Sequence, residues 1–188
     1  MIERLAKLLS RLPGIGPRHA NRLAFYLATR SKKETAELAE AILGLAKLKT
    51  CAECFASHEE TTAICSICGD KKRNQKLVAI VERETDRMSL EKTRAFTGRY
   101  LIIGALPKDG VLTSEHKQRL AVLLKAAPEE VIIALSPTTY GDANAESIVK
   151  ELEKASIKIT RLGRGIPTGG EVEFADEETL KNALQNRG

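Results

Sequence analysis

The sequence predicts an α/β protein made of several modules: a helical N-terminal region, a small four-cysteine module, a parallel-rich α/β sheet domain and a C-terminal helix. Three observations lead to this prediction. Apolar residues recur at helical spacing near the N-terminus, four cysteines stand in two close pairs, and short β-rich runs alternate with helical stretches from Leu77 onward. We therefore divide the chain into residues 1–50, 51–76, 77–162 and 163–188.

Composition excludes several classes of protein. The 188 residues are 43% hydrophobic and 29% charged, which is too apolar for a disordered chain. An apolar run of 18 residues is absent, and charged residues interrupt the first 13 positions, so neither a membrane-spanning helix nor a secretory signal is predicted. We expect a cytoplasmic protein that has no contact with membranes.

The positive charge is concentrated at the N-terminus. Residues 1–33 carry eight Lys or Arg and one Glu, a balance of +7, whereas the other 155 residues carry 22 basic and 24 acidic side chains, a balance of −2. An anionic partner is therefore expected at the N-terminal region. Aromatic residues make up 4% of the chain and Trp is absent, which favours contacts with a phosphate backbone over stacking on bases.

Two predicted helices flank a glycine-rich turn in this basic region. Apolar residues repeat with helical spacing over 2–12 and again over 20–27, and the sequence Leu-Pro-Gly-Ile-Gly-Pro at 12–17 interrupts them. A third amphipathic helix is predicted over 34–48.

The turn and the second helix form a candidate phosphate-binding site. Gly14 and Gly16 permit a tight turn and leave backbone amides open, while Arg18 and Arg22 lie one turn apart on the following helix. This pattern resembles a helix–hairpin–helix element, which binds the DNA backbone independently of sequence. An ordinary helix–helix turn with solvated arginines is the alternative.

The four cysteines form two C-x2-C pairs separated by ten residues. Two such turns can close a tetrahedron of thiolates around Zn²⁺, with no coordination position left for catalysis, so we expect one structural zinc ion per chain. Two disulfides or a redox pair are the alternatives. We expect His58, in the intervening loop, to be a solvated polar residue and not a substitute ligand. The predicted ligands are Cys51, Cys54, Cys65 and Cys68.

A polar basic stretch, Lys71–Lys76, leads into the α/β region. There, strands are predicted over 77–82, 100–104, 131–135 and 157–162, and helices near 85–96, 114–126 and 143–155. Alternation of this kind predicts a mainly parallel sheet with helices on its faces. A Gly/Pro-rich segment, 163–170, precedes a last helix near Glu177–Gln185.

Acidic residues follow two of the predicted strands. Glu82 stands at the end of the first, and Asp142 lies in a loop after the third. The carboxyl ends of strands are where open α/β sheets place their functional sites. Together these acids resemble those of a Toprim domain, in which a Glu and a D-x-D pair bind Mg²⁺ for phosphoryl transfer. This chain has no D-x-D sequence, and Tyr140 stands two positions before Asp142.

The order of these modules resembles the RecR family of bacterial recombination proteins over essentially the whole chain. The terminal segment 165–174, Gly-Ile-Pro-Thr-Gly-Gly-Glu-Val-Glu-Phe, adds to the likeness. The resemblance implies a DNA-repair protein without enzymatic activity, which forms dimers and ring-shaped tetramers around DNA. It also implies partnership with RecO and RecF in loading RecA onto gapped, SSB-coated DNA.

Carried over by position, the family's functional residues fall on three places. The DNA-contacting hairpin residues correspond to Arg18 and Arg22, and the zinc ligands to the four cysteines. The acids associated with partner contact correspond to Glu82, Asp86 and Asp142. Where the family has Thr-Val-Glu-Gly-Glu/Asp, this chain reads Thr-Thr-Tyr-Gly-Asp at 138–142, so Tyr140 replaces a Glu.

Three functions compete at this point. The first is a non-catalytic DNA clamp and adaptor. The second is a Mg²⁺-dependent Toprim nuclease or topoisomerase that uses Glu82, and the third is a zinc-stabilised adaptor that binds no nucleic acid.

The resemblance implies that segment 161–174 takes part in packing between subunits. We do not interpret it as an ATP site, since the chain has no G-x-x-x-x-G-K-[ST] loop.

Overall fold

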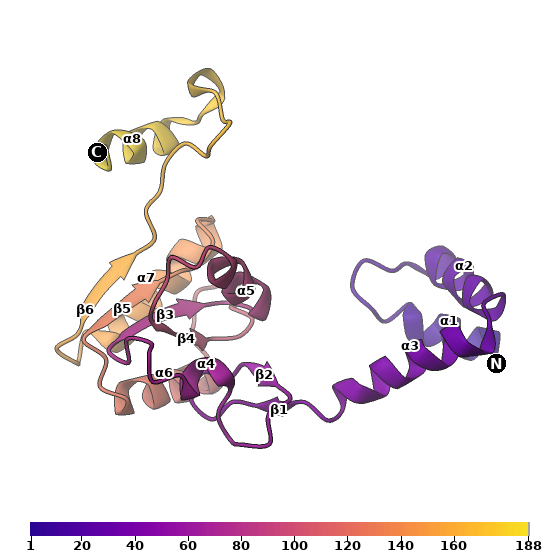
Figure 1. The fold of residues 1–188 in the computed structure, drawn as a ribbon. Coiled ribbons are helices and arrows are strands. Elements are labelled where there is room, and N and C mark those ends of the chain that lie inside the picture. The colour runs from indigo at the N-terminus through magenta and orange to yellow at the C-terminus, as the bar shows by residue number, and fades with distance from the viewer. Residues whose placement is uncertain (188) are drawn as a thin grey trace. The chain divides into compact units, whose positions relative to one another are not determined.

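The computed structural model describes residues 1–187 and divides into two units, Met1–Leu48 and the chain from Lys49 onward (Figure 1). Each unit is described by itself below. Within the described residues, every helix is too short or too polar to span a membrane.

The N-terminal unit contains α1 (Ile2–Leu9), α2 (Pro17–Ala28) and α3 (Lys32–Leu45). Helices α1 and α2 pack against each other, and alanines fill their buried positions: Ala6 on α1 and Ala20 and Ala24 on α2. Small side chains let the two helices approach closely, which fixes the turn between them.

Helix α3 begins and ends for local reasons. The Ser31 hydroxyl and the Glu34 carboxylate form a reciprocal capping box, and hydrogen bonds from Ser31 lower the pKa of Glu34. The helix ends at Leu45, three residues before the predicted end, because residues 46–48 continue in tighter turns with hydrogen bonds to the third residue back. No residue of α3 is buried.

The second unit is built on a four-stranded sheet in which every neighbouring pair is parallel, as predicted (Figure 1). Three of its strands consist largely of buried β-branched or aliphatic residues, which suits a sheet covered on both faces. In spatial order the strands are β4 (Arg99–Ile102), β3 (Leu77–Val81), β5 (Glu130–Ile133) and β6 (Lys158–Arg161).

Successive residues of β3 serve two different cores because side chains alternate across a strand. Val78 and Ile80 belong to a core that also contains residues of α6 (Ser114–Lys125) and α7 (Thr139–Leu152). Its fully buried side chains each contribute about 1.5–3 kcal/mol of burial free energy. They include Ile80, Leu120 and Ile148.

The other core joins the sheet to the four-cysteine module. Ala79 and Val81 of β3 lie in one cluster with the cysteines and with Leu90 of α5 (Glu84–Lys92). The Cys54 carbonyl also accepts a hydrogen bond from the Ile102 amide of edge strand β4, at 2.9 Å. The module therefore covers part of the sheet and one of its exposed strand edges. It contains β1 (Lys49–Thr50), β2 (Ser57–His58) and α4 (Ser66–Gly69).

Two further helix boundaries differ from the sequence prediction by four residues each. Helix α5 ends at Lys92 and not at residue 96, because Arg94 adopts a left-handed backbone conformation with φ of 55°. Helix α7 begins at Thr139 and not at residue 143, because the Thr138 hydroxyl accepts a hydrogen bond from the Gly141 amide and caps the helix. Asp142 therefore lies in the first turn of α7, whereas the sequence analysis placed it in a loop.

The chain ends in a short 3₁₀ helix, η1 (Val172–Phe174), and in α8 (Glu177–Gln185), which has the predicted bounds. Asp176 caps α8, because its carboxylate accepts a hydrogen bond from the Thr179 amide, and this bond lowers the Asp176 pKa.

Candidate functional site

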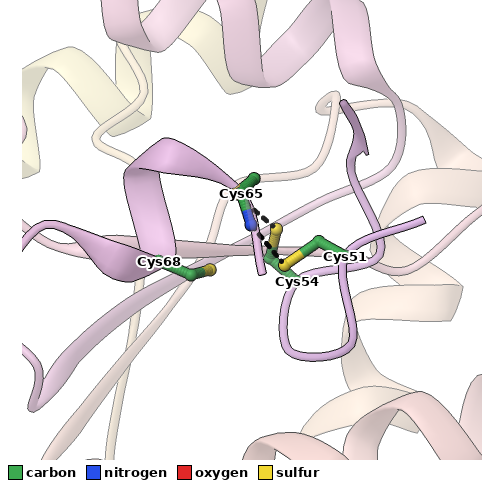
Figure 2. A group of neighbouring side chains, drawn as sticks. All are labelled: Cys51, Cys54, Cys65 and Cys68. Atoms are coloured by element: carbon green, nitrogen blue, oxygen red, sulfur yellow. Dashed lines mark hydrogen bonds between the residues drawn. The ribbon is translucent and has the colours of Figure 1, made fainter. Parts of the chain in front are cut away.

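The four cysteines converge on one point (Figure 2). Cys51 and Cys54 come from a turn closed by the Phe55 amide, which donates to the Cys51 carbonyl at 3.0 Å. Cys65 and Cys68 come from the start and the body of α4. All four sulfur atoms lie within 4.8 Å of one another, and the residues are 7% exposed or less.

The cysteines are free thiols, and the sulfur atoms of Cys54 and Cys65 lie 3.5 Å apart. A disulfide requires about 2.05 Å, so the structure contains no disulfide among them. One of the thiols ionises readily: a hydrogen bond from Cys68 lowers the pKa of the Cys54 thiol to about 6, whereas burial raises the pKa of Cys65 to about 11 and the hydrogen bond with Cys54 raises the pKa of Cys68. Four convergent buried sulfurs, one of them easily ionised, form a metal site.

His58 is not the solvated residue that the sequence analysis expected. It is 7% exposed, and its Nδ1 lies 2.6 Å from the Glu60 carboxylate. Glu60 also accepts a hydrogen bond from the Ser66 amide. Hydrogen bonds from backbone amides, first that of Glu60 itself and then that of Ser66, lower the pKa of the Glu60 carboxyl group to about 2. His58 is not part of the sulfur group; the pair braces the loop between the two cysteine turns.

The N-terminal turn presents an open helix start. Gly16 is the N-cap of α2 and Pro17 its first residue, and no side chain caps the exposed amides. Arg18 and Arg22 are exposed on this helix, and neither forms an ion pair within residues 1–187. Free amides, the helix dipole and two unpaired cations thus lie along the first half of α2.

The two turn glycines have different roles. Gly14 has a φ of 79°, a conformation that favours glycine, so the chain direction depends on it. Gly16 has a φ of −76°, which any residue can adopt, and an added Cβ would meet open space. Its lack of a side chain matters only because it leaves the helix start uncovered.

Glu82 and Asp86 line one cleft at the carboxyl edge of the sheet, with a volume of about 340 Å³. Both are held by Arg83: its guanidinium donates to Glu82 at 3.1 Å, and its amide donates to Asp86 at 2.9 Å. Tyr140 is 56% exposed and lines the same cleft.

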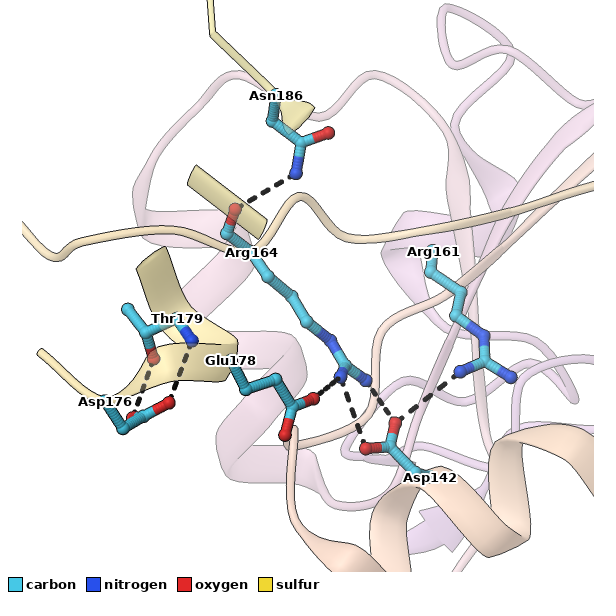
Figure 3. A network of polar contacts seen from close by, with 7 residues as sticks. All are labelled: Asp142, Arg161, Arg164, Asp176, Glu178, Thr179 and Asn186. Carbon is cyan, nitrogen blue, oxygen red and sulfur yellow. Dashed lines mark hydrogen bonds and ion pairs between the residues drawn. The ribbon is translucent and has the colours of Figure 1, made fainter. Parts of the chain in front are cut away.

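Asp142 does not line that cleft. Its carboxylate pairs with the guanidinium of Arg164 in the C-terminal segment, and Arg161 lies 3.5 Å away (Figure 3). Arg164 also reaches Glu178 of α8 at 3.4 Å, and its pKa is raised, chiefly by the hydrogen bond with Asp142. The predicted group of three acids is thus split between two places.

Comparisons with known proteins agree with this arrangement. Residues 2–45 match the family model "RecR, helix-hairpin-helix", residues 76–163 match "Toprim domain", and residues 165–187 match "RecR, C-terminal". Recombination protein RecR of Anaeromyxobacter sp. (strain Fw109-5) is 39% identical over 99% of this chain and 96% of its own length. The chain belongs to the RecR family. RecR proteins of Thermus thermophilus and Streptomyces coelicolor are 40% and 35% identical, over 98% and 100% of this chain and 94% and 96% of theirs.

Sequence reasoning missed two residues in this RecR-family chain. Arg164 is one, because its contact with Asp142 joins positions 22 residues apart and leaves no local pattern. Asn144 is the other: it is 1% exposed, and its amide donates to the carbonyls of Pro107 and Tyr140, both at 2.8 Å. These bonds tie the Tyr140 backbone in the first turn of α7 to the backbone at Pro107. A polar residue within the apolar repeat of α7 was the only available signal for Asn144.

Proposed function

We propose that the protein is a non-catalytic DNA-binding adaptor of recombinational repair, which grips the phosphate backbone through the N-terminal hairpin. The observation that supports this most directly is the open start of α2 beside exposed, unpaired Arg18 and Arg22. Such a site recognises phosphate and carries no information about base sequence. Family membership supports the place in recombination. The proposal locates the protein in the cytoplasm, on DNA.

RecO- and RecF-type proteins are the proposed partners, in the loading of RecA onto gapped, SSB-coated DNA. Glu82 and Asp86 supply carboxylates for them in a cleft that Arg83 and Lys108 also line, and Tyr140 lies beside these groups. An exposed aromatic next to carboxylates suits a protein partner, since Tyr is enriched in protein interfaces. We propose that Asp142 contributes through its pairing with Arg164 and not as a free acid.

Zinc is the metal that we propose for the cysteine cluster. Four thiolates in two C-x2-C turns suit Zn²⁺, and such a site has no open position for substrate. Its role here is to hold the module together against the sheet, because the cysteines are part of that core.

Assembly into dimers and tetramers is part of the same proposal. Helix α3 carries exposed apolar side chains along one face, among them Ile42, 58% exposed, and Leu45, 64% exposed. The C-terminal segment carries others, including Phe174 at 80%. A helix that buries no residue within its own chain favours burial against a second copy.

The decisive test replaces Arg18 and Arg22 together by Ala and measures DNA affinity over a range of salt concentrations. We expect weaker binding to every sequence alike, and a plot of log K against log salt that is shallower by about 0.9 for each lost phosphate contact on duplex DNA. Both side chains are exposed, so folding should be unaffected. Unchanged affinity and slope would contradict the hairpin assignment.

A Mg²⁺-dependent enzyme is the second candidate, favoured by the match to the Toprim model. Against it, Asp142 is neutralised by Arg164, and Asp86 is committed to the Arg83 amide. DNA cleavage or relaxation that requires Mg²⁺ and disappears in Glu82→Gln would establish this candidate in place of the adaptor.

A further inference from the structure

Three segments of the chain meet at the amino edge of the sheet, opposite the edge that holds the acids. Strands β4, β3 and β5 are adjacent and parallel, so the segments that precede them, 70–76, 93–98 and 126–129, must lie side by side. Hydrogen bonds join them: the Asn74 amide donates to the Thr97 carbonyl at 2.9 Å, and the Lys76 ammonium donates to the Ala127 carbonyl at 3.1 Å.

This edge carries a surplus of positive charge. Six basic side chains on or beside the three segments are exposed, and none forms an ion pair within the residues that the structure describes. Nearby acids are mostly neutralised, since Glu91 pairs with Arg73 and Glu130 with Lys158. Asp70 and Glu129 are the nearby acids that form no ion pair within the described residues. We call the six the edge cations: Lys71, Lys72, Lys76, Lys92, Arg94 and Lys125.

Local stability explains only part of this surplus. Lys92 and Lys125 lie in the last turns of α5 and α6, where cations complement the exposed carbonyls. Lys71 and Lys72 lie in a loop before a strand and have no such role, whereas Lys76 donates a hydrogen bond to the Ala127 carbonyl just after α6. Like charges gathered there repel one another, so their clustering needs another reason.

We propose that the edge cations form a second contact with the phosphate backbone of nucleic acid, in addition to the hairpin; this inference rests on the proposed DNA-binding function. Three adjacent strands cover about 10 Å, since neighbours lie about 4.8 Å apart. One DNA strand rises about 3.4 Å per nucleotide along the duplex axis, and successive phosphates lie farther apart than this because the backbone winds around the axis, so the edge can contact about two successive phosphates of one strand.

The chemistry of the loop favours nucleic acid over an acidic protein segment. The exposed residues of the loop at 71–76 are Lys71, Lys72, Asn74 and Lys76, without an apolar side chain. A protein interface is usually anchored by buried aromatic or aliphatic groups, whereas backbone contacts to nucleic acid need only cations and hydrogen-bond donors.

The test compares two triple variants of the full-length protein. Lys71→Gln/Lys72→Gln/Lys76→Gln removes three edge cations. Lys108→Gln/Lys117→Gln/Lys181→Gln removes the same charge from exposed sites away from that edge, in the loop after β4, in the first turn of α6 and on α8; none of these lysines forms an ion pair within the described residues, and the variant serves as the matched control. Each is made in the natural background and with Arg18→Ala/Arg22→Ala. Fluorescence anisotropy measures binding to a short labelled duplex over a range of salt concentrations.

We expect the edge variant to bind on the order of tenfold more weakly at moderate salt than the control variant, with a slope shallower by about 2. The loss should persist in the hairpin background, because the two contacts are separate. An edge variant that matches the control in affinity and slope would overturn the inference and leave the hairpin proposal standing. If the edge variant loses DNA binding and Arg18→Ala/Arg22→Ala keeps it, the edge inference stands and the hairpin proposal is wrong.

A labelled oligoglutamate peptide distinguishes the two classes of partner. Binding of this peptide should not differ between the edge and control variants. If the edge variant loses only the peptide and keeps its DNA affinity, the inference is wrong and the edge binds an acidic protein. Matching melting temperatures of the two triple variants establish that the comparison is between folded proteins.

Discussion

Single residues at the hairpin separate the requirements of folding from those of binding. Gly14 is needed for the backbone, because its φ of 79° costs a residue with a side chain about 1–2 kcal/mol. The backbone conformation does not require a glycine at position 16, since the φ of −76° and ψ of 166° of Gly16 are ordinary for an N-cap residue. Serine would be a better cap there, so glycine at this position is explained by access to the helix amides and not by stability.

Gly16→Ser should therefore move stability and binding in opposite directions. The new hydroxyl would accept a hydrogen bond from the Arg18 or His19 amide and stabilise α2 by a few tenths of a kcal/mol. The same bond withdraws an amide from phosphate, so DNA affinity should fall several-fold. Urea unfolding and anisotropy titration measure the two effects. Unchanged DNA affinity in a more stable protein would show that the open amides do not contribute to binding.

At the scale of elements, the features that depend on local sequence patterns were predicted better than the features that depend on long-range contacts. The alternation of β-rich and helical runs predicted all four parallel strands, because periodicity and strand–helix order are local properties. Spacing also placed the four cysteines in one cluster. The start of α7 was predicted four residues late, because the Thr138 hydroxyl accepts a hydrogen bond from the Gly141 amide and so caps a helix that begins at Thr139. The burial of His58 and the pairing of Arg164 depend on residues that only the fold brings near.

The cysteine module and the sheet form one structural element, which has a consequence for metal removal. The cysteines share a core with Ala79 and Val81, and Cys54 accepts a hydrogen bond from the Ile102 amide. Loss of the metal should unfold the module and expose β4, destabilising the second unit by about 3 kcal/mol or more.

Metal analysis should find one zinc ion per chain, and Cys68→Ser should lower this content. Amide hydrogen exchange then locates the damage: Ile102 should lose protection on chelation, whereas amides of α1 and α2 in the separate first unit should keep theirs. If the purified protein contains one zinc ion per chain and removal of that zinc by a chelator leaves the exchange of the Ile102 amide unchanged, the metal has no structural role.

The whole molecule separates charge by location. The N-terminal hairpin and the amino edge of the sheet are basic, while Glu82 and Asp86 lie at the carboxyl edge. The sequence showed the first basic region and, of the second, the basic stretch Lys71–Lys76 alone, because the other edge cations come from two further segments and are balanced by acids elsewhere in the chain. Parallel topology sorts these charges, since it collects every strand start at one edge and every strand end at the other.

Assembly would multiply these contacts, because several weak phosphate sites on one particle bind together far more tightly than one. The face of α3 that carries Leu38, Ile42 and Leu45 is the expected interface, as these positions follow one another at helical spacing and are exposed. Ile42→Glu should place a charge in that interface and yield particles of lower mass in multi-angle light scattering, with weaker and less salt-dependent DNA binding. Ala36→Glu adds the same charge to the other side of α3, on the face that carries Leu43, and should leave the mass unchanged. Masses of both variants equal to that of the natural protein would exclude α3 as the interface and would direct the search to the exposed apolar residues of the C-terminal segment.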